Sequence, residues 1–566
     1  MTSFYTDEIN TLVLISLLKK HGIRKIIASP GTTNISFVGS VQSDPYFEVY
    51  SVVDERAAGF MACGLAEESG EAVVISCTGA TASRNYIPGL TEAYYRNLPI
   101  LAVTSTQHTG KIGNYVAQVI DRGSCFNDMV KMSIELPTVY SENDKQDTIT
   151  KVNNILLELF HHVPGPCHIN LCTVYSNRFT VQNLPEYRMI RRISMGNFPE
   201  LPKGEIAIFV GAHQAFSEKE TNAIDAFCGT NDAVVICDQI SNYRGEYRFL
   251  ANLANSQQVN QGVKEYELII YIGYVHGAYI PFRSKQLWRV NPDGQIRDPY
   301  RNLTYVFEME EIDFFLHYSN GEKKNNLFRK CESITANLLR MIPELPFSNM
   351  WIAKETSYLI PDNSILHLSI LNTLRVWNYF ETPKSVLCYS NSGGYGIDGC
   401  LSSFFGSALA NPEKEHYMVI GDLSFFYDLN IMLNCIPPNI HILLINNGIG
   451  TEFKNYSHRA AYFGDKANSF IAAEGHNGFK NLNLVKGLCK ELDVKYLSAK
   501  SKEDYLENRD TWLKCDSGPV LMEVFTTDKD ESDALYLMNT IIKDNSINKK
   551  IRNCIVWKIA RKIFRG

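Results

Sequence analysis

The chain has 566 residues, of which 45% are hydrophobic and 20% are charged. This length is too great for one hydrophobic core and predicts about three domains of ordinary size. The composition excludes a disordered or low-complexity chain. A net charge of -6 gives no reason to expect nucleic acid as a partner.

The cysteines and the N-terminus indicate the compartment. None of the 14 cysteines forms a CxxC pair, and Cys63, Cys77 and Cys237 lie in apolar runs typical of reduced core residues. The first residues, MTSFYTDEIN, lack the basic and apolar regions of a signal peptide. No apolar stretch approaches the roughly 18 residues that a membrane-spanning helix needs. We therefore expect a cytoplasmic protein.

The N-terminal third alternates between strands and helices. Residues 8–20 have helical apolar spacing, and His21-Gly22 is a good stop signal. The apolar runs KIIAS, EVYSVV, AVVISC and PILAVTST then alternate with helical segments. This alternation predicts a parallel sheet covered on both faces. The first domain, residues 1–180, would include the run GPCHINL as its last strand.

The same alternation returns twice along the chain. A proline-bearing passage at 196–204 is typical of a linker, and a central domain follows over residues 195–325. The third domain spans residues 345–545. We predict an α/β fold of three successive doubly wound parallel-sheet domains. The lone glycine in IFVGAHQ is not a dinucleotide fingerprint.

The stretch from Gly421 to Gly450 carries the strongest chemical signal. Asp422 follows the apolar run HYMVI, and Asn446-Asn447 follow the run IHILLI. Ligands of parallel sheets bind at the carboxyl ends of the strands. Carboxylate and amide oxygens suit a hard divalent cation that carries a diphosphate, with Mg²⁺ the expected ion. GD and NNG are also ordinary strand-ending turns, so this stretch alone leaves both interpretations open.

Glu55 is the second residue of interest. It follows an apolar strand and precedes a helix rich in alanine and glycine. One interpretation is a helix N-terminal acid that complements the macrodipole. The other is a carboxylate placed to hydrogen-bond a ligand nitrogen. The residue taken by itself favours the first.

Taken together, these residues resemble the thiamine diphosphate (ThDP) enzymes of the decarboxylase and carboligase superfamily. The order in that superfamily is pyrimidine-binding, central and diphosphate-binding domain. Glu55 matches its activating glutamate. Within the superfamily the motifs are most similar to the 2-succinyl-5-enolpyruvyl-6-hydroxy-3-cyclohexene-1-carboxylate synthase family of the menaquinone pathway. Four stretches carry the likeness: Asp54-Glu55-Arg56, SNSGGYGIDG from Ser390, GDLSFFYDLN from Gly421 and NNGIGTEF from Asn446.

The resemblance implies a role for each matched residue. Glu55 would hydrogen-bond the aminopyrimidine ring and favour the imino tautomer that removes the thiazolium C2 proton. Ile397 would wedge between the two cofactor rings. Asp422, Asn447 and the carbonyl of Ile449 would bind Mg²⁺ or Mn²⁺. Gln118 is the second predicted catalytic residue, and the other predicted cofactor-binding residues are Gly79, Asn391, Gly421, Leu423 and Ser424.

The resemblance fails at the arginines with which that synthase family binds its substrates. PGTT stands where the family has PGSR, STQH where it has ADRP, and SNSG where it has SNRG. Each lost bidentate contact removes about 1.5–3 kcal/mol, which argues against isochorismate plus 2-oxoglutarate as the substrate pair. Arg375 matches a family arginine. The predicted substrate-binding residues are Thr32, Thr33, Gln107, His108, Arg297, Arg375, Ser392, Glu452 and Phe453.

The leading hypothesis is a ThDP- and Mg²⁺-dependent enzyme that decarboxylates a 2-oxoacid and passes the acyl carbanion to an acceptor. One alternative is a simple decarboxylase, for example of a phosphonopyruvate-type oxoacid. Another is a ThDP-binding subunit without catalysis, against which the retained Glu55 argues. His108, His458 and His476, in loops near the predicted site, either transfer protons or only pack.

Self-association and a membrane contact are further expectations. The family places its cofactor between subunits, which implies at least a homodimer, either a dimer or a tetramer. The tail at 546–566 alternates basic and apolar residues. It could lie on an anionic membrane surface, which would make the enzyme membrane-peripheral, or it could dock on the protein itself.

Overall fold

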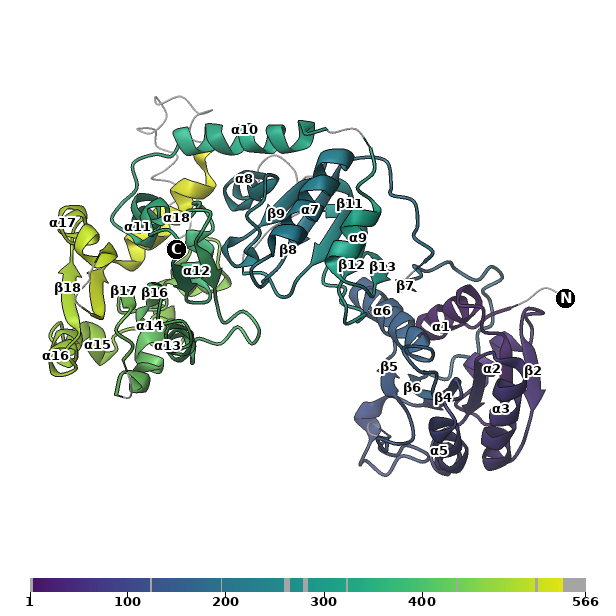
Figure 1. Ribbon diagram of the computed structural model, residues 1–566. Coiled ribbons are helices and arrows are strands. Elements are labelled where there is room, and N and C mark those ends of the chain that lie inside the picture. The colour runs from purple at the N-terminus through teal and green to yellow at the C-terminus, as the bar shows by residue number, and fades with distance from the viewer. Residues whose placement is uncertain are drawn as a thin grey trace, which may run out of the picture. The chain divides into compact units, whose positions relative to one another are not determined.

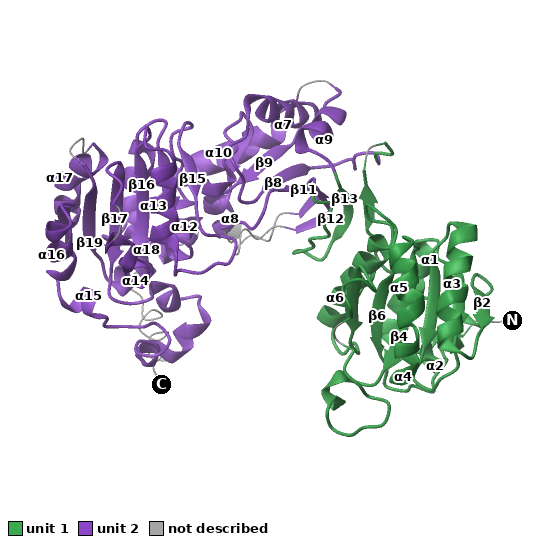
Figure 2. Cartoon of the chain, turned by 60° about the horizontal axis from the view of Figure 1, so that its bottom comes forward, with its two compact units in different colours: residues 1–198, 293–308 green, residues 199–292, 309–566 purple. Residues whose placement is uncertain are grey.

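A computed structural model describes most of the chain: residues 4–122, 125–194, 196–258, 265–277, 283–321, 324–433, 436–514 and 518–542. The chain divides into two compact units (Figure 2). Unit 1 comprises Met1–Phe198 and Asp293–Glu308, and unit 2 comprises Pro199–Pro292 and Met309–Gly566. The tail at 546–566 lies outside the described residues. The boundaries of the three domains stay predictions.

Unit 1 is built on a parallel sheet flanked by helices (Figure 1). Its strand order is β2-β1-β3-β4-β6-β5. Its strands are β1 (Lys25–Ala28), β2 (Glu48–Ser51), β3 (Val73–Cys77), β4 (Ile100–Thr106), β5 (Met132–Leu136) and β6 (Cys167–Cys172). Its helices are α1 (Ile9–Lys20), α2 (Ile35–Val41), α3 (Glu55–Ser69), α4 (Thr81–Asn85), α5 (Ile87–Tyr95) and α6 (Glu142–Glu158). Two further strands of unit 1, β7 (Arg191–Ile193) and β13 (Leu303–Phe307), pair in parallel.

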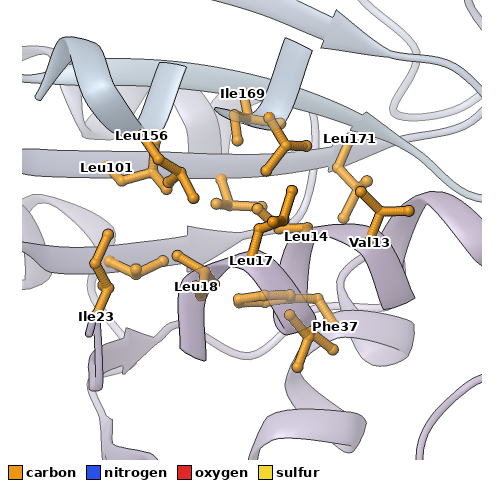
Figure 3. Close-up of a cluster of buried hydrophobic side chains, with 14 of the residues drawn as sticks. Val13, Leu14, Leu17, Leu18, Ile23, Phe37, Leu101, Leu156, Ile169 and Leu171 are labelled. Atoms are coloured by element: carbon orange, nitrogen blue, oxygen red, sulfur yellow. The ribbon is translucent and has the colours of Figure 1, made fainter. Parts of the chain in front are cut away.

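The core of unit 1 lies where α1 and α6 pack on this sheet. Leu14 and Leu17 of α1, Leu156 of α6 and Leu101 of β4 are completely or almost completely buried in one cluster (Figure 3). Burial of each such side chain contributes about 1.5–3 kcal/mol. Helix α1 ends at Lys20 as predicted, because Gly22 then adopts the left-handed φ of 75° that suits glycine.

Unit 2 contains two groups of parallel strands. The first has the order β10-β9-β8-β11-β12, and the second the order β15-β14-β16-β17-β19-β18. The strands are β8 (Ile206–Val210), β9 (Val234–Cys237), β10 (Arg248–Leu250), β11 (Glu265–Ile272), β12 (Arg283–Val290), β14 (Ile365–Leu368), β15 (Leu387–Tyr389), β16 (His416–Gly421), β17 (Ile440–Asn446), β18 (Lys495–Ala499) and β19 (Val520–Phe525).

The helices of unit 2 flank these strands. They are α7 (Glu218–Asn231), α8 (Asn252–Gln258), α9 (Glu311–His317), α10 (Asn326–Arg340), α11 (Asn349–Thr356), α12 (Asn372–Trp377), α13 (Cys400–Ala410), α14 (Asp422–Tyr427), α15 (Asn477–Lys480), α16 (Leu484–Glu491), α17 (Lys502–Leu513) and α18 (Asp528–Asn539). The parallel sheets flanked by helices confirm the predicted α/β fold class. Within the described part of the chain, no helix combines the length and the apolar character needed to cross a membrane.

The β1–β6 sheet and the β14–β19 sheet share one topology. In each, the first strand lies between the second and the third, and the sixth lies between the fourth and the fifth. The second and third strands therefore lie on opposite sides of the first strand, and the strand order reverses at that point. Such a point opens a crevice at the carboxyl edge of the sheet and is the usual place for a ligand. Each sheet therefore offers one edge at which loop residues can form a site.

Candidate active site

Unit 2 has a cavity of about 410 Å³ at the carboxyl edge of β14, β16 and β17. The loops that follow these strands supply most of its wall, and α18 closes one side. Nine of the residues predicted from sequence lie in this wall: Ile397, Gly421, Asp422, Leu423, Ser424, Asn447, Ile449, Glu452 and Phe453. The cavity thus brings together predicted residues from position 397 and from the separate stretches 421–424 and 447–453.

Asp422 is the most strongly held acid of this cavity. It is buried, and its Oδ2 accepts hydrogen bonds from the backbone of Asn447 at 3.1 Å and of Gly448 at 2.6 Å. The Nε2 of His476 lies 3.1 Å from the same oxygen. Oδ1 accepts from the Leu423 backbone at 2.7 Å. Oδ1 therefore keeps acceptor capacity that Oδ2 has used, and it is the oxygen that can bind a cation.

The tautomer of His476 follows from its two partners. The backbone N–H of Phe479 donates to its Nδ1 at 3.2 Å, as the cap of α15. With Nδ1 an acceptor, the proton of the ring lies on Nε2 and is donated to Asp422. His476 therefore orients the carboxylate of Asp422. A proton-transfer role for His476 stays a prediction.

The two asparagines of the NNG turn have different surroundings. Asn446, at the end of β17, is fully buried and donates to the Glu523 carboxylate at 2.6 Å. Asn447 lines the cavity, where its Oδ1 is 3.4 Å from the backbone nitrogen of Ile449. Gly448 adopts a φ of 74°, and a Cβ there would lie 2.5 Å from the Phe479 ring. Glycine is thus required for the turn that presents Asn447 and Ile449.

Ile397 is tied to the GD turn. The hydroxyl of Ser424 donates to its carbonyl at 2.8 Å, which holds the loop before α13 over the start of α14. Asn391 and Ser392, in the same loop, do not line the cavity. The Asn391 amide instead donates to Gly399 at 3.1 Å and to Ser403 at 3.1 Å, which closes the loop on itself.

Arg375 and Glu452 form an ion pair beside the cavity. The Arg375 guanidinium donates to one carboxylate oxygen of Glu452, whose side chain is 19% exposed. In the orientation of the Asn372 amide that satisfies its neighbours, its nitrogen donates to the other oxygen at 2.6 Å. Arg375 and Glu452, both predicted to bind substrate, are therefore paired with each other in this structure.

Two more carboxyl groups lie close to Asp422 and were not singled out from the sequence. Glu531 of α18 lines the cavity, and burial raises its pKa to about 7. Burial also raises the pKa of Glu523, and the charge of Asp422 adds to the shift for both groups. A divalent cation bound at Asp422 would offset this accumulation of negative charge.

In unit 1 the predicted residues follow the strands of the first sheet. Thr32 and Thr33 come after β1, Glu55 after β2 and Gly79 after β3. The Thr33 hydroxyl accepts from the Gly79 backbone at 3.2 Å and donates to the Ser105 carbonyl at 2.8 Å. Thr33 is buried, so its hydroxyl joins three strand ends.

Glu55 is the first residue of α3, where Asp54 caps the helix. The Glu55 side chain is partly exposed, and the Asn85 amide lies 3.4 Å from its Oε2. Gln118 is exposed and has a left-handed φ of 62°. A Cβ at Gly79 would lie 3.0 Å from the Gln118 carbonyl, so this segment packs closely on the β3 loop.

The remaining predicted residues of unit 1 lie on its surface or cap turns. Thr32 and Arg297 are exposed. The His108 ring accepts from the Gly110 backbone at 3.0 Å, which caps a short 3₁₀ helix. The Gln107 amide donates to the Tyr175 hydroxyl at 3.0 Å and accepts from Lys111 at 2.6 Å.

Arg122 is a buried cation that the sequence interpretation did not single out. It is 4% exposed, and its Nη2 donates to the Asn170 amide oxygen at 2.6 Å. Its Nε and Nη1 have no hydrogen-bond partner among the described residues. Burial lowers its pKa. A Cβ at Gly79 would lie 3.6 Å from Nη2, so this positive charge lies beside the predicted residues of the first sheet.

The donor set of unit 2 fits a divalent cation that carries a diphosphate. A carboxylate, an amide oxygen and a backbone carbonyl are hard oxygen ligands of the kind that Mg²⁺ prefers. The wall beyond them is apolar at Ile370, Val376 and Leu535 and polar at Ser369, Asn372 and Thr373. A cavity of this size with few polar groups is typical of cofactor sites.

Comparison with known proteins identifies the class. The family model "Thiamine pyrophosphate enzyme, N-terminal TPP binding domain" matches residues 11–125, which lie in unit 1. Three curated relatives are each named 2-succinyl-5-enolpyruvyl-6-hydroxy-3-cyclohexene-1-carboxylate synthase. The protein of Bacteroides thetaiotaomicron is 30% identical over 92% of this chain and 96% of its own length. That of Bacteroides fragilis is 28% identical over 92% and 97%, and that of Phocaeicola vulgatus 29% identical over 94% and 98%.

The chain therefore belongs to the family of thiamine diphosphate-dependent enzymes that contains these synthases. This finding confirms the resemblance inferred from the GD…NN and Glu55 motifs. It also confirms ThDP as the cofactor and an enzyme of the 2-oxoacid decarboxylase and carboligase type. The roles of the individual residues, the metal ion, the substrates and the location in the cell stay predictions.

Proposed function

We propose that this enzyme uses ThDP and Mg²⁺ to decarboxylate a 2-oxoacid and to transfer the acyl group to an acceptor. The observation that carries the proposal is the meeting of Asp422, Asn447 and Ile449 in one cavity of unit 2. ThDP supplies, when bound, the carbon nucleophile that adds to the oxoacid and accepts the electrons released with carbon dioxide. The protein provides binding, orientation and control of protons.

In this proposal, the residues of unit 2 bind the cation and orient the cofactor. Oδ1 of Asp422 would hold the cation, and the N–H groups of Asn447 and Gly448 fix the carboxylate through its other oxygen. The Asn447 side chain and the Ile449 carbonyl would complete the protein ligands. Ile397 is held in place through the Ser424 hydroxyl and would support the cofactor rings.

Glu55 of unit 1 controls a proton. With the cofactor bound, its carboxylate would hydrogen-bond the pyrimidine ring and favour the tautomer that can act as a base. The proposal requires that a unit 1 and a unit 2 hold the same cofactor molecule. In keeping with the family, we propose that these belong to different copies of the chain, in a dimer or a tetramer.

We propose that the product of this enzyme differs from the one in the relatives' names. The Arg375 guanidinium is engaged by Glu452. Binding of a second carboxylate at Arg375 would have to displace this acid, which opposes a polyanionic acceptor through like-charge repulsion. Arg122, buried without a carboxylate partner in the described part of unit 1, supports an anionic donor such as a 2-oxoacid.

A panel of 2-oxoacids tests the proposal. Carbon dioxide release is measured with ThDP and Mg²⁺, with ThDP and EDTA, and with each candidate acceptor carbonyl or alkene. The proposal expects one oxoacid to be decarboxylated in a metal-dependent manner and the product to contain the acceptor. Release of a free aldehyde with every acceptor would favour the simple decarboxylase. Cofactor binding without any turnover would favour the subunit without catalysis.

A further inference from the structure

A histidine-rich cluster in unit 1 shares no residue with those proposed for catalysis. His161 and His162 form the turn that follows α6, and Glu308 comes directly after β13. His161 is 5% exposed, whereas the side chain of His162 is 67% exposed. The two rings stack at 3.9 Å. The segment that carries Glu308 is the part of unit 1 that returns after the long insertion of unit 2 residues (Figure 2).

The hydrogen bonds of His161 leave one nitrogen without a donor or an acceptor. Its Nδ1 lies 3.0 Å from Oε2 of Glu158, to which it donates. Its Nε2 is buried and has no hydrogen-bond partner among the described residues. The nearest charged atom is Oε2 of Glu308 at 3.3 Å. A neutral His161 therefore leaves the lone pair of its buried Nε2 without a donor and 3.3 Å from a carboxylate oxygen, which is unfavourable unless a cation lies nearby.

The cluster brings three candidate ligand atoms close together, and its two stacked imidazole rings would turn toward a common point when they bind one ion. Nδ1 of His162 lies 3.3 Å from Oε1 of Glu308, as Nε2 of His161 does from Oε2. One ligand atom from each residue can be chosen so that all three lie within 4.8 Å of one another. A tetrahedral ion with bonds of 2.0–2.1 Å holds its ligands about 3.3 Å apart. The oxygen then lies off the axis of the imidazole lone pair, which agrees with the missing hydrogen bond at His161.

The backbone around the cluster is shaped to bring the ligands together. His162 adopts a φ of 56°, which is unusual for a residue other than glycine, asparagine or aspartate. Gly294 has a φ of 58°, and a Cβ there would lie 2.6 Å from Oε2 of Glu308. Strained backbone of this kind persists where the surroundings require it.

Charged side chains surround the two histidines and Glu308. Glu158, which accepts from His161, lies 3.5 Å from the Lys131 ammonium. A carboxylate on the far nitrogen of a histidine is the usual support of a metal-binding imidazole. Arg192 lies 3.9 Å from Glu308 but donates to the carbonyls of Gly294 and Leu157. Neither cation donates a hydrogen bond to the side chains of the three proposed ligands among the described residues.

We propose that His161, His162 and Glu308 bind a divalent transition-metal ion of the Zn²⁺ type. Imidazole nitrogens favour such ions over Mg²⁺, which prefers oxygen ligands, so this site is distinct from the one at Asp422. The fourth position faces solvent beside the exposed His162. The ion clamps the returning segment Asp293–Glu308 to the end of α6 and so stabilises unit 1.

The alternative to a metal ion is a proton on His161 that lies between its Nε2 and the Glu308 carboxylate. An imidazolium at His161 would donate to both Glu158 and Glu308, and no metal would be needed. The two occupants differ in the role of His162. A metal ion requires its Nδ1 as a ligand, whereas a protonated His161 does not involve it.

Metal titration of the full-length protein decides between them. Protein freed of metal with EDTA is saturated with ThDP and Mg²⁺ and then titrated with Zn²⁺, or with Co²⁺ for its visible absorption. We expect one tight equivalent and a Co²⁺ spectrum of four-coordinate type without thiolate bands. His162→Asn is the principal variant, since asparagine tolerates the left-handed backbone and the position is exposed. It should weaken binding more than about 100-fold.

Three further variants separate the proposal from its alternatives. Glu158→Gln should weaken binding by about 10–100-fold, as loss of an outer-shell carboxylate does. His108→Ala removes an exposed histidine of the same unit and should leave binding unchanged. Asp422→Asn should also leave it unchanged, because it alters only the cofactor metal. Absence of a tight equivalent in the wild-type protein, or equal affinity in His162→Asn, would overturn the proposal and leave a protonated His161.

Discussion

Replacement of Asp422 by asparagine changes the charge of the unit 2 cavity while it keeps the size of the side chain. The carboxylate accepts from three backbone N–H groups and from His476. An asparagine amide has only one acceptor oxygen, so it cannot replace both Oδ1, which accepts from Leu423, and Oδ2, which accepts from the other donors. It also presents a neutral oxygen, or an NH₂ group, to the cation. We therefore expect the loss of metal-dependent cofactor binding rather than a local unfolding of α14.

The magnitude follows from the charge-assisted contact that is removed. Such a contact contributes about 1.5–3 kcal/mol, and a central value weakens Mg²⁺-dependent ThDP binding by about 50-fold. At a cofactor concentration of 100 times the wild-type Kd, ligand binding stabilises the wild-type protein by about 2.7 kcal/mol. The variant at the same concentration would gain only about 0.6 kcal/mol.

Urea unfolding with and without Mg²⁺ and ThDP measures both values. Asp428→Asn is the matched control, since Asp428 is a buried carboxylate next to α14 that accepts from Ser402 at 2.6 Å and 2.7 Å but does not line the cavity. The control should lose stability without cofactor and keep the full cofactor-induced gain. An Asp422→Asn protein with the wild-type gain would refute the metal site.

Three further predictions concern titration and specificity. Burial raises the pKa of Glu531 from 4.5 to about 7, so the folded protein keeps a proton that the unfolded chain releases near pH 4.5. The free energy of unfolding of the metal-free protein should therefore decrease by up to about 3 kcal/mol as the pH rises from about 4.5 to 7. Glu531→Gln should remove this pH dependence in urea unfolding. Burial lowers the pKa of His168 to about 3, so stability should fall as the pH drops from about 6.5 to 3, and His168→Asn should flatten this acid limb in thermal scans. Glu452→Gln frees Arg375 from its acid, so kcat/KM for dicarboxylic over monocarboxylic 2-oxoacids should rise roughly tenfold; an unchanged ratio would show that the ion pair does not set specificity.

Local signals predicted the elements, and the resemblance carried by several motifs together predicted the cofactor. The end of α1 follows from Gly22, and the positions of Asp422 and Asn447 follow from the apolar runs that became β16 and β17. In a parallel sheet, adjacent strands end at one edge, so the sequence sufficed to bring these two side chains together. Separating Asn446 from Asn447 required the burial that β17 imposes.

Contacts between distant loops could not be predicted from the sequence. Three contacts depend on how distant segments fold back on one another: the pairing of Arg375 with Glu452, the hydrogen bond from His476 to Asp422, and the hydrogen bond from the Arg122 guanidinium to Asn170. Such geometry sets specificity without leaving a motif. A pair of adjacent histidines was visible in the sequence, but Glu308 lies 147 positions beyond His161 (308 − 161), and only the structure places it there.

The exchange of the thiazolium C2 proton of bound ThDP with deuterium tests the central claim most directly, because it reports cofactor activation without knowledge of the substrate. The protein is loaded with ThDP and Mg²⁺, diluted into D₂O, quenched with acid at intervals and analysed by NMR. We predict that the wild-type protein accelerates exchange over free ThDP and that Glu55→Gln slows it by about 100-fold to 10,000-fold while it still binds the cofactor. Wild-type exchange rates in Glu55→Gln would contradict the account.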